Sequence, residues 1–253
     1  MLPVHETETC SVAAAAAIVG AKWTVLIVHD LSEGPRRFTQ LELETFSAYQ
    51  VRVTIHGNAV HPGSAKGRLV NALKLASALI GSLPADRLSP ETTEDREGYV
   101  HPARVRGTAA EAVVTFIARD HDDAKLDEHV ALIRQLAEQV VAGEQRARVA
   151  IEVEESYRNM RQVLDRHPDV VAAAEEAIRR AGVEPKRTII RGGTDGARLT
   201  ERGLPTPNLF TGGQDYHSVR EWASVQDMAA AAATVVELVR LWAEPGRGKP
   251  TSD

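Results

Sequence analysis

Between residues 46 and 156, hydrophobic residues repeat with two different periods, in an order that few folds allow. Val51, Val53 and Ile55 alternate with polar residues, which predicts a strand with one buried face. Two later segments repeat every three to four residues, which predicts amphipathic helices with one apolar face. Their apolar positions are Leu69, Ala72, Leu73, Ala76 and Ile80 in the first helix and Leu126, Val130, Ile133, Leu136 and Val140 in the second.

Three further strands complete this region. They are predicted at residues 98–106 and 111–119, joined at Gly107 and Thr108, and around Val149, Ile151 and Val153. The resulting order, β-α-β-β-α-β, predicts a ferredoxin-like domain at 46–156, in which two helices cover one face of an antiparallel sheet. Residues 84–97 contain two prolines and a run of charges, and they are predicted to form a solvent-exposed loop.

Residues 157–244 follow an α/β pattern. The predicted elements are a helix at 169–181, a short strand at 187–191, a turn and helix after Gly192 and Gly193, a short strand before Gly212, and a long helix at 225–242. The long helix carries an apolar stripe that predicts packing in the core, and this stripe consists of Met228, Ala232, Val235, Val239 and Trp242. The tail at 245–253 is rich in Gly, Pro, Ser and Lys, which predicts disorder.

Composition limits the class of protein. The chain has 253 residues, of which 43% are hydrophobic and 26% charged, which is enough for one large domain or two small ones. A net charge of −5 gives no general attraction to nucleic acid or membranes. The single cysteine, Cys10, excludes an internal disulfide and fits a reducing cytoplasm. The Ala-rich run at 13–20 is too short, and its upstream flank too acidic, for a signal peptide.

The N-terminal 41 residues differ from the rest. Residues 10–31 predict two short helices, and a Gly-Pro pair ends the second. This stretch resembles the start of a winged-helix regulator of the HxlR type, and the matching positions are Cys10, Gly20, Lys22, Trp23, Gly34, Pro35, Arg37 and Phe38. In that family a recognition helix and a β-wing follow, but neither is predicted here. Residues 1–41 are therefore expected to be a truncated helical stub, and DNA binding is not expected.

Four motifs occur in order downstream of residue 42. They are HPGSAKG at 61–67, FIARD at 116–120, RGGTDGA at 191–197 and PNLFTGG at 207–213, which is followed by His217. Together they resemble the second half of the peptidase T family, the tripeptide aminopeptidases of the dinuclear-zinc exopeptidase superfamily, over about residues 42–243. The resemblance implies an α/β fold class, with an incomplete zinc-exopeptidase catalytic domain at 157–244 and a dimerisation domain at 46–156.

The resemblance assigns roles to four residues. It makes His217 a zinc ligand, and the glycines before it leave room for an ion. His61 would reach the partner subunit's active site and stabilise a developing oxyanion. Arg191 would hold a peptide's terminal carboxylate, and Arg119 would have a second substrate-binding role. From the residues alone, a surface position for His217, a turn position for His61 and an ion pair for Arg191 remain open.

The implied site is incomplete in this chain. Two zinc ions need a bridging carboxylate, further His, Asp and Glu ligands and a Glu general base. The resemblance places nearly all of these groups upstream of the matched region, where only the stub precedes it. Five local pairs imitate them without the expected setting: His167 with Asp169, Glu154 with Glu155, Glu175 with Glu176, His121 with Asp122, and His29 with Asp30. Asp195 is expected to cap a helix.

The sequence thus predicts a truncated peptidase T-like metallopeptidase with no complete catalytic site, which is inactive alone. It is expected to form a homodimer through the ferredoxin-like domain, to bind small peptides if it binds any substrate, and not to enter membranes. An alternative is a non-catalytic dimerising protein that pairs with an intact peptidase. A transcription regulator is a third interpretation, which the missing recognition helix argues against. A rearranged gene joining two fragments at residues 40–42 also remains compatible with the sequence.

Overall fold

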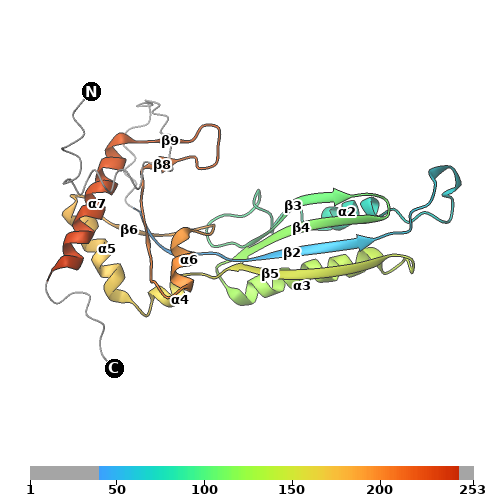
Figure 1. Cartoon of the computed structure of the whole chain (residues 1–253), viewed down its shortest axis with the longest axis horizontal. Coiled ribbons are helices and arrows are strands. Elements are labelled where there is room, and N and C mark those ends of the chain that lie inside the picture. Colours follow the sequence, from blue (N-terminus) through green and yellow to red (C-terminus); the bar gives the residue numbers. More distant parts are fainter. Residues whose placement is uncertain (1–39, 245–253) are drawn as a thin grey trace, which may run out of the picture. The chain divides into compact units, whose positions relative to one another are not determined.

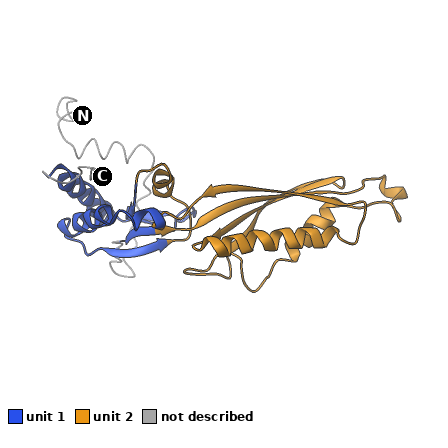
Figure 2. Cartoon of the chain, turned by 90° about the horizontal axis from the view of Figure 1, so that it is seen from below, with its two compact units in different colours: residues 1–43, 162–189, 205–253 blue, residues 44–161, 190–204 orange. Residues whose placement is uncertain are grey.

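The computed structural model describes residues 40–244, and these form two compact units (Figure 2). Within the described part, unit 1 contains residues 40–43, 162–189 and 205–244, and unit 2 contains residues 44–161 and 190–204. Residues 157–161 and 190–204, assigned above to the second domain, therefore group with unit 2. The predicted stub, except for its last two residues, and the predicted tail lie outside the described residues.

Unit 2 is built on an antiparallel sheet with the strand order β3-β4-β2-β5 (Figure 1). Its main elements are β2 (Ser47–His56), α2 (Ala72–Gly81), β3 (Tyr99–Gly107), β4 (Glu111–Asp120), α3 (Asp123–Val141) and β5 (Arg148–Tyr157), with a short 3-10 turn, η2 (Pro62–Ser64), after β2. Both helices pack on one face of the sheet, and their apolar residues share one core with the strands. The predicted α/β class and the β-α-β-β-α-β order are confirmed.

The core of unit 2 follows from the two periods in the sequence. Val51, Val53 and Ile55 of β2 and Val114 and Phe116 of β4 are all completely buried. Their neighbours along each strand point to the opposite face of the sheet, because successive strand residues alternate in direction. The helices add the other side of this core with Ala72, Ala76 and Leu79 from α2 and Leu126, Val130, Ile133 and Ala137 from α3.

Two capping side chains decide where the helices of unit 2 begin. The side-chain Oδ1 of Asn71 accepts a hydrogen bond from the Leu73 amide at 2.9 Å, so α2 starts at Ala72. Asp122 accepts from the Ala124 amide at 2.8 Å, so α3 starts at Asp123. Hydrophobic periodicity alone places these boundaries about three residues away, because a cap is a polar feature that periodicity does not record.

Unit 1 contains a small sheet with the strand order β6-β1-β7 and two helices that pack against each other, α5 and α7. Its elements are β1 (Gln40–Thr45), α4 (Arg161–Leu164), α5 (Pro168–Arg180), β6 (Lys186–Ile190), β7 (Asn208–Leu209), β8 (Gly213–Gln214), β9 (Trp222–Ala223) and α7 (Val225–Ala243). Three of these elements extend into unit 2, namely α4 by Arg161, β6 by Ile190, and β1 by Glu44 and Thr45. Among residues 40–244, every helix is too short or too polar to cross a lipid bilayer.

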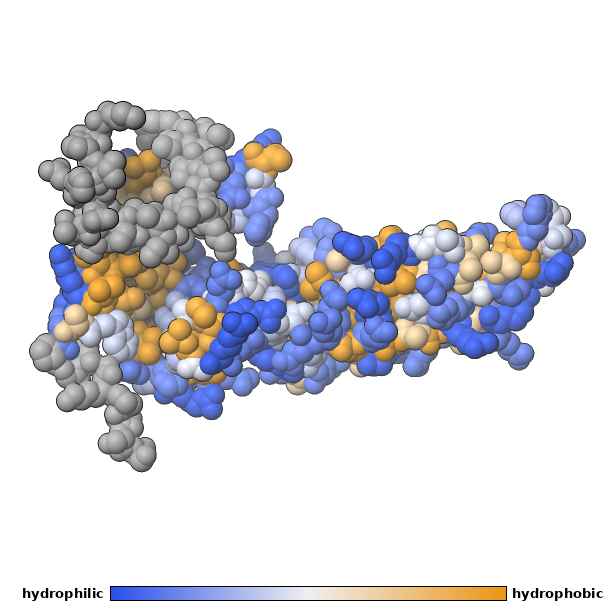
Figure 3. Space-filling model, in the orientation of Figure 1, coloured by the Kyte–Doolittle hydropathy of each residue, from blue (hydrophilic) through white to orange (hydrophobic). Residues whose placement is uncertain are grey.

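The apolar stripe of α7 does not form a core, so that prediction is wrong. Val239 is 64% exposed, and Val235 and Trp242 are each 38% exposed. The helix instead buries Thr234 and Leu241, which lie seven residues apart and therefore on one face. Apolar residues gather over the region of α5 and α7 in the space-filling view (Figure 3). A helical period shows that an apolar face exists, but not what covers it.

Candidate anion-binding site

Arg119 lies near the end of β4 and is held by two aromatic residues of unit 2. In the sheet it pairs with Tyr99 of β3 on one side and with Ala48 of β2 on the other. Its Nη1 donates a hydrogen bond to the Tyr99 hydroxyl at 2.8 Å. The guanidinium carbon lies 5.8 Å from the Tyr99 ring centroid and 5.9 Å from that of Tyr157. These contacts orient the guanidinium without neutralising it.

Arg191 approaches the same aromatic residue from a different segment. Its Nη2 donates to the Thr93 hydroxyl at 2.7 Å, and its guanidinium carbon lies 5.7 Å from the Tyr99 ring centroid. A second ring, that of Phe46, lies 5.6 Å away. The structure therefore brings together Arg119 and Arg191, two residues that the sequence analysis selected separately for substrate binding. Thr93 belongs to the loop predicted to be simply solvent-exposed, so that description is incomplete.

This pair of cations has no anion within the described part of the chain. Neither Arg119 nor Arg191 has a carboxylate partner among residues 40–244, so the ion pair left open for Arg191 is not formed there. Arg119 Nε, Arg191 Nη1 and the Tyr157 hydroxyl are buried without a hydrogen-bond partner. Leaving a buried donor unpaired costs about 1–3 kcal/mol. Because both arginines lie beside the Tyr99 ring and each has an unpaired donor, this part of unit 2 is a candidate site for an oxyanion ligand.

Tyr157 reaches this site because a glycine leaves room for its ring. A Cβ atom placed on Gly193 would lie 2.5 Å from two carbons of the Tyr157 ring, which is closer than real contacts allow. Burial raises the pKa of the Tyr157 hydroxyl, so it stays protonated and can donate. Gly193 of the RGGTDGA motif thus allows the Tyr157 ring to pack closely at the candidate site.

The same motif starts the short helix α6 (Asp195–Glu201). Its N-cap is Thr194, whose hydroxyl accepts a hydrogen bond from the Ala197 amide at 3.0 Å. Asp195 follows in the first turn, where a negative charge is favourable at the positive end of the helix. The prediction that Asp195 caps the helix is therefore wrong by one residue.

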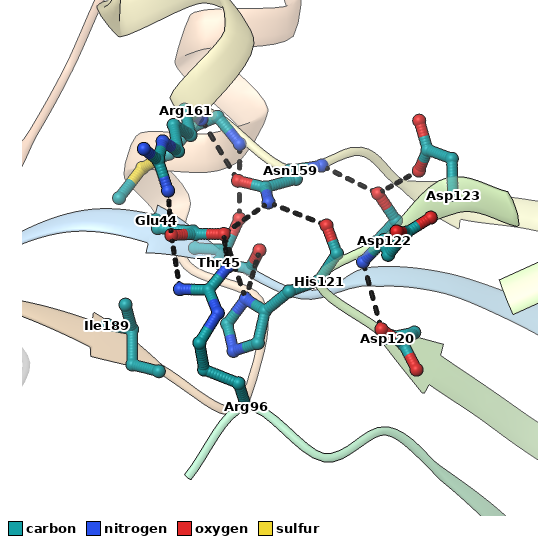
Figure 4. Close-up of polar contacts among 12 residues, drawn as sticks. Glu44, Thr45, Arg96, Asp120, His121, Asp122, Asp123, Asn159, Arg161 and Ile189 are labelled. Atoms are coloured by element: carbon teal, nitrogen blue, oxygen red, sulfur yellow. Dashed lines mark hydrogen bonds and ion pairs between the residues drawn. The ribbon is translucent and has the colours of Figure 1, made fainter. Parts of the chain in front are cut away.

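A buried carboxylate, Glu44, organises a second polar group in unit 2 (Figure 4). The side chain of Glu44 is 5% exposed and binds Arg96 through both oxygens, at 2.6 and 2.8 Å. Arg161 Nη1 donates to it at 3.0 Å and Asn159 Nδ2 at 3.2 Å. His121 Nδ1 lies 3.6 Å from the same carboxylate. Four separate segments of the chain therefore meet at one negative charge.

Burial and nearby charges have opposite effects on the pKa values of Glu44 and His121. Burial on its own would raise the pKa of Glu44, but hydrogen bonds from Arg96 and Asn159, with the charges of Arg96 and His121, lower it to about 2. Burial lowers the pKa of His121, which favours the neutral ring. His121, which follows β4, is only 8% exposed, and its Nδ1 lies 3.2 Å from the Thr45 carbonyl.

Sequence reasoning missed Glu44, Arg96 and Asn159. The alternation of Leu41 and Leu43 with Glu42 and Glu44 is a short strand signal, and it does correspond to β1. It would place Glu44 among solvated strand residues. No local pattern connects Glu44 with arginines 52 and 117 residues further along the chain.

His61 lies at the other end of β2 from Arg119. It is exposed and caps the turn η2, where its Nδ1 accepts a hydrogen bond from the Gly63 amide at 3.1 Å. Arg119 pairs with Ala48, near the start of β2, whereas His61 follows the end of that ten-residue strand. A strand of this length spans roughly 30 Å. The two predicted substrate-binding positions therefore do not meet within one copy of unit 2.

His217 lies in the loop between β8 and β9 of unit 1. It is exposed, it has a positive φ of 66°, and its amide donates to Glu221 Oε2 at 3.0 Å. A catalytic zinc ion takes about three protein ligands. Residues 40–244 contain no group of three or more His, Cys, Asp or Glu side chains that could hold a metal ion. The described residues therefore do not fit a zinc site on their own.

Comparison with known proteins identifies relatives of most of the chain. Residues 43–144 match the family model of the peptidase dimerisation domain. Peptidase T from Serratia proteamaculans is 44% identical over 206 residues, which are 81% of this chain and 50% of that protein. The chain thus spans about half the length of the curated relatives that it matches.

Solved structures share the fold at low sequence identity. A tripeptidase from Staphylococcus aureus has a TM-score of 0.66 at 20% identity, covering 82% of this chain and 55% of its own. A hydantoinase/carbamoylase family amidase from Burkholderia vietnamiensis has a TM-score of 0.60 at 21% identity, covering 81% and 50%. The fold is therefore common to proteins named for different activities, a tripeptidase and an amidase. Most of the chain is thus similar to about half of peptidase T, and its residues 43–144 match the peptidase dimerisation domain.

Proposed function

We propose that this chain corresponds to part of a peptidase T-like metallopeptidase. In this proposal it binds short peptides by their C-terminal carboxylate and does not form a complete catalytic centre alone. The observation that carries the proposal is the pair Arg119 and Arg191 beside Tyr99, with buried N–H groups that have no partner among the described residues. A guanidinium presents its donors in a planar fork that matches a carboxylate. Two such forks and the Tyr157 hydroxyl suit the end of a peptide.

Catalysis by the family would need zinc, with release of the N-terminal residue from a tripeptide. The resemblance makes His217 one zinc ligand, but the donors around it among residues 40–244 do not form a metal-binding group. In this proposal the chain therefore carries out no reaction step alone. Its contribution, in this proposal, is to position the peptide and to supply the dimerisation domain.

The proposal is tested by comparing tri-alanine with tri-alanine amide. The full chain is titrated with each peptide by calorimetry at low ionic strength. Because hydrogen bonds to charged groups are worth about 1.5–3 kcal/mol, the acid should bind at least about tenfold more tightly than the amide. Equal affinity for the two peptides would remove the carboxylate from the proposal.

Inactivity is tested separately on the same preparation. We expect fewer than two zinc ions per chain by elemental analysis after exposure to zinc, and no release of alanine from tri-alanine. Two bound ions together with sustained release of alanine would show that the chain completes the site, while leaving carboxylate binding intact.

We further propose that unit 2 joins two copies of the chain through the outer edge of β3. Residues 103–107 of this edge strand are exposed, and Val105 is 52% exposed. An edge strand with an exposed apolar residue is a template for pairing with another strand. A charge at this position should disfavour that pairing.

Val105→Lys is accordingly expected to weaken the dimer at least about tenfold, as one desolvated charge can cost more than 1.4 kcal/mol. The molar mass in solution, measured by light scattering over a concentration series, checks this. Glu152→Lys on β5, at the opposite edge of the sheet, is the matched control and should leave the dimer unchanged. Dissociation by the control and not by Val105→Lys would assign the interface to the other edge.

His61 has a geometry that supports its proposed role in a dimer. Because its Nδ1 accepts the Gly63 amide hydrogen, the neutral ring carries its proton on Nε2. An exposed N–H donor on the turn beyond β2 is the group needed to stabilise an oxyanion in a second subunit.

A second candidate function is a non-catalytic subunit that pairs with an intact peptidase. The observation that favours it is the match of residues 43–144 to the dimerisation domain in a chain whose described residues hold no group of metal-binding side chains. Co-expression with a tagged full-length peptidase T, followed by affinity purification, tests it. Recovery of only the self-associated chain would exclude this function.

A further inference from the structure

A groove on the open face of the unit 2 sheet lies apart from the proposed peptide site at Arg119 and Arg191, although three of its lining residues belong to the β3 edge proposed above to join two copies. It has a volume of about 400 Å³, and its lining residues are Gln50, Arg52, Ala103, Arg104, Arg106, Thr115 and Ile117. The helices cover the other face, on which Val51, Val53, Val114 and Phe116 are buried. The groove is therefore formed entirely by β2, β3 and β4 within unit 2.

The sheet register gathers three arginines around one threonine. Arg52 of β2 and Arg104 of β3 both pair with Thr115 of β4, one from each side. Adjacent strands lie about 4.8 Å apart, so the two arginine backbones are separated by roughly 10 Å across Thr115. Arg106 follows two residues along β3 and pairs with Val113, so its side chain leaves the same face roughly 7 Å away.

The groove offers hydrogen-bond donors and no negative charge. Its polar lining consists of three guanidiniums, the Gln50 amide and the Thr115 hydroxyl, all of which can donate. Arg52 has an exposed ionic partner, Glu152 at 3.3 Å. Arg104 and Arg106 have no carboxylate partner among residues 40–244. These two arginines and the paired Arg52 lie on one face of a chain with a net charge of −5, and an anion bound in the groove would reduce their mutual repulsion.

We propose that this groove binds a small organic phosphate. A phosphate dianion carries several acceptor oxygens, and forked guanidiniums bind such groups through paired hydrogen bonds. Ala103 and Ile117 supply an apolar surface for the organic part of the ligand. The volume lies in the usual range of small-molecule sites, roughly 300–1,000 Å³. No aromatic side chain lines the groove on which a nucleic acid base could stack, which favours a small ester over single-stranded nucleic acid.

The test uses the ¹⁵N-labelled full chain in NMR titrations with phenyl phosphate, inorganic phosphate and acetate at matched ionic strength. We expect saturable shifts of the amide signals of Gln50, Thr115 and Ile117 with both phosphates. Phenyl phosphate should bind more tightly than inorganic phosphate because of the apolar surface, and acetate at least about tenfold more weakly than inorganic phosphate because it has one charge and two oxygens.

Variants locate the site. Arg104→Ala with Arg106→Ala should weaken phenyl phosphate binding at least about tenfold, because two charge-assisted hydrogen-bonding groups are lost. The matched control, Lys74→Ala with Arg134→Ala, removes two exposed charges from α2 and α3 and should change the affinity less than twofold. Light scattering and thermal unfolding verify that each variant keeps its mass and fold.

Three outcomes would overturn the proposal. They are shifts that rise linearly without saturation, an equal loss of affinity in the control variant, or tighter binding of a short single-stranded oligonucleotide than of phenyl phosphate. Each result is independent of peptide binding at Arg119 and Arg191, because the phosphates are titrated without peptide.

Discussion

Replacing Glu44 by glutamine is expected to lower the free energy of unfolding by about 3 kcal/mol, because the buried carboxylate loses charge-assisted hydrogen bonds worth about 1.5–3 kcal/mol each, while its half-exposed arginine partners keep contact with water. The substitution keeps the size of the side chain and removes the charge that Arg96 binds at 2.6 and 2.8 Å. It also leaves Arg161 without its 3.0 Å contact. Urea unfolding at pH 7, followed by circular dichroism, measures the change.

Acid should reduce the difference in stability between the unsubstituted chain and Glu44→Gln. The pKa of Glu44 is lowered from 4.5 to about 2 in the folded chain, so its stabilising effect is fully present above pH 4.5 and is lost as the pH falls towards 2. A shift of this size corresponds to roughly 3 kcal/mol, in agreement with the mutational expectation. The stability of Glu44→Gln relative to the unsubstituted chain should therefore recover between pH 4.5 and pH 2.

The control for this experiment is Glu152→Gln. Glu152 also binds an arginine, Arg52, at 3.3 Å, but its side chain is 69% exposed. Exposed ion pairs contribute about 0–1 kcal/mol, so this variant should unfold almost like the original chain. Equal effects of the two substitutions would mean that burial does not strengthen the Glu44 interactions.

Replacing both Arg119 and Arg191 by methionine is expected to weaken tri-alanine binding about a hundredfold, since each loses charge-assisted hydrogen bonds worth about 1.5–3 kcal/mol. Methionine retains much of the apolar stem that packs beside the Tyr99 ring. Each single variant should lose about tenfold. Calorimetric titration with tri-alanine and with tri-alanine amide separates this effect from non-specific losses.

The amide peptide provides an internal check, because it lacks the charge that the arginines are proposed to bind. Its affinity should be nearly the same in all of these proteins. Arg134→Met on α3 is the charge-matched control and should bind tri-alanine normally. If the double variant and the control lost affinity equally, net charge rather than the Arg119–Arg191 site would be responsible.

The ferredoxin-like topology could be predicted because its evidence is local. The alternation of Val51, Val53 and Ile55 and the longer period in α2 and α3 each record which face of one element is buried. The stripe on α7 failed for the same reason. Val239 fits the helical period but is 64% exposed. The period shows which residues share a face of the helix, but not whether a neighbouring element covers that face.

The same limit applies to the candidate site, where the sequence could identify residues but not their neighbours in space. The motifs pointed to Arg119 and Arg191. The structure adds that both lie beside Tyr99 and that neither has a carboxylate partner among the described residues. The motifs also selected His61 and His217. The structure places His61 at the opposite end of β2 from Arg119, and the donors described around His217 form no metal group.

By itself, the sequence determined the order of strands and helices in unit 2, the relation to peptidase T and the residues worth testing. These depend on patterns within a few tens of residues. Only the tertiary structure decided that Glu44 is a buried charge bound by Arg96 and Arg161, and that Arg52, Arg104 and Arg106 line one groove. Such groups form when the sheet register and the loops bring distant side chains within a few ångströms, and electrostatic interactions depend on that distance and on burial, not on separation along the chain.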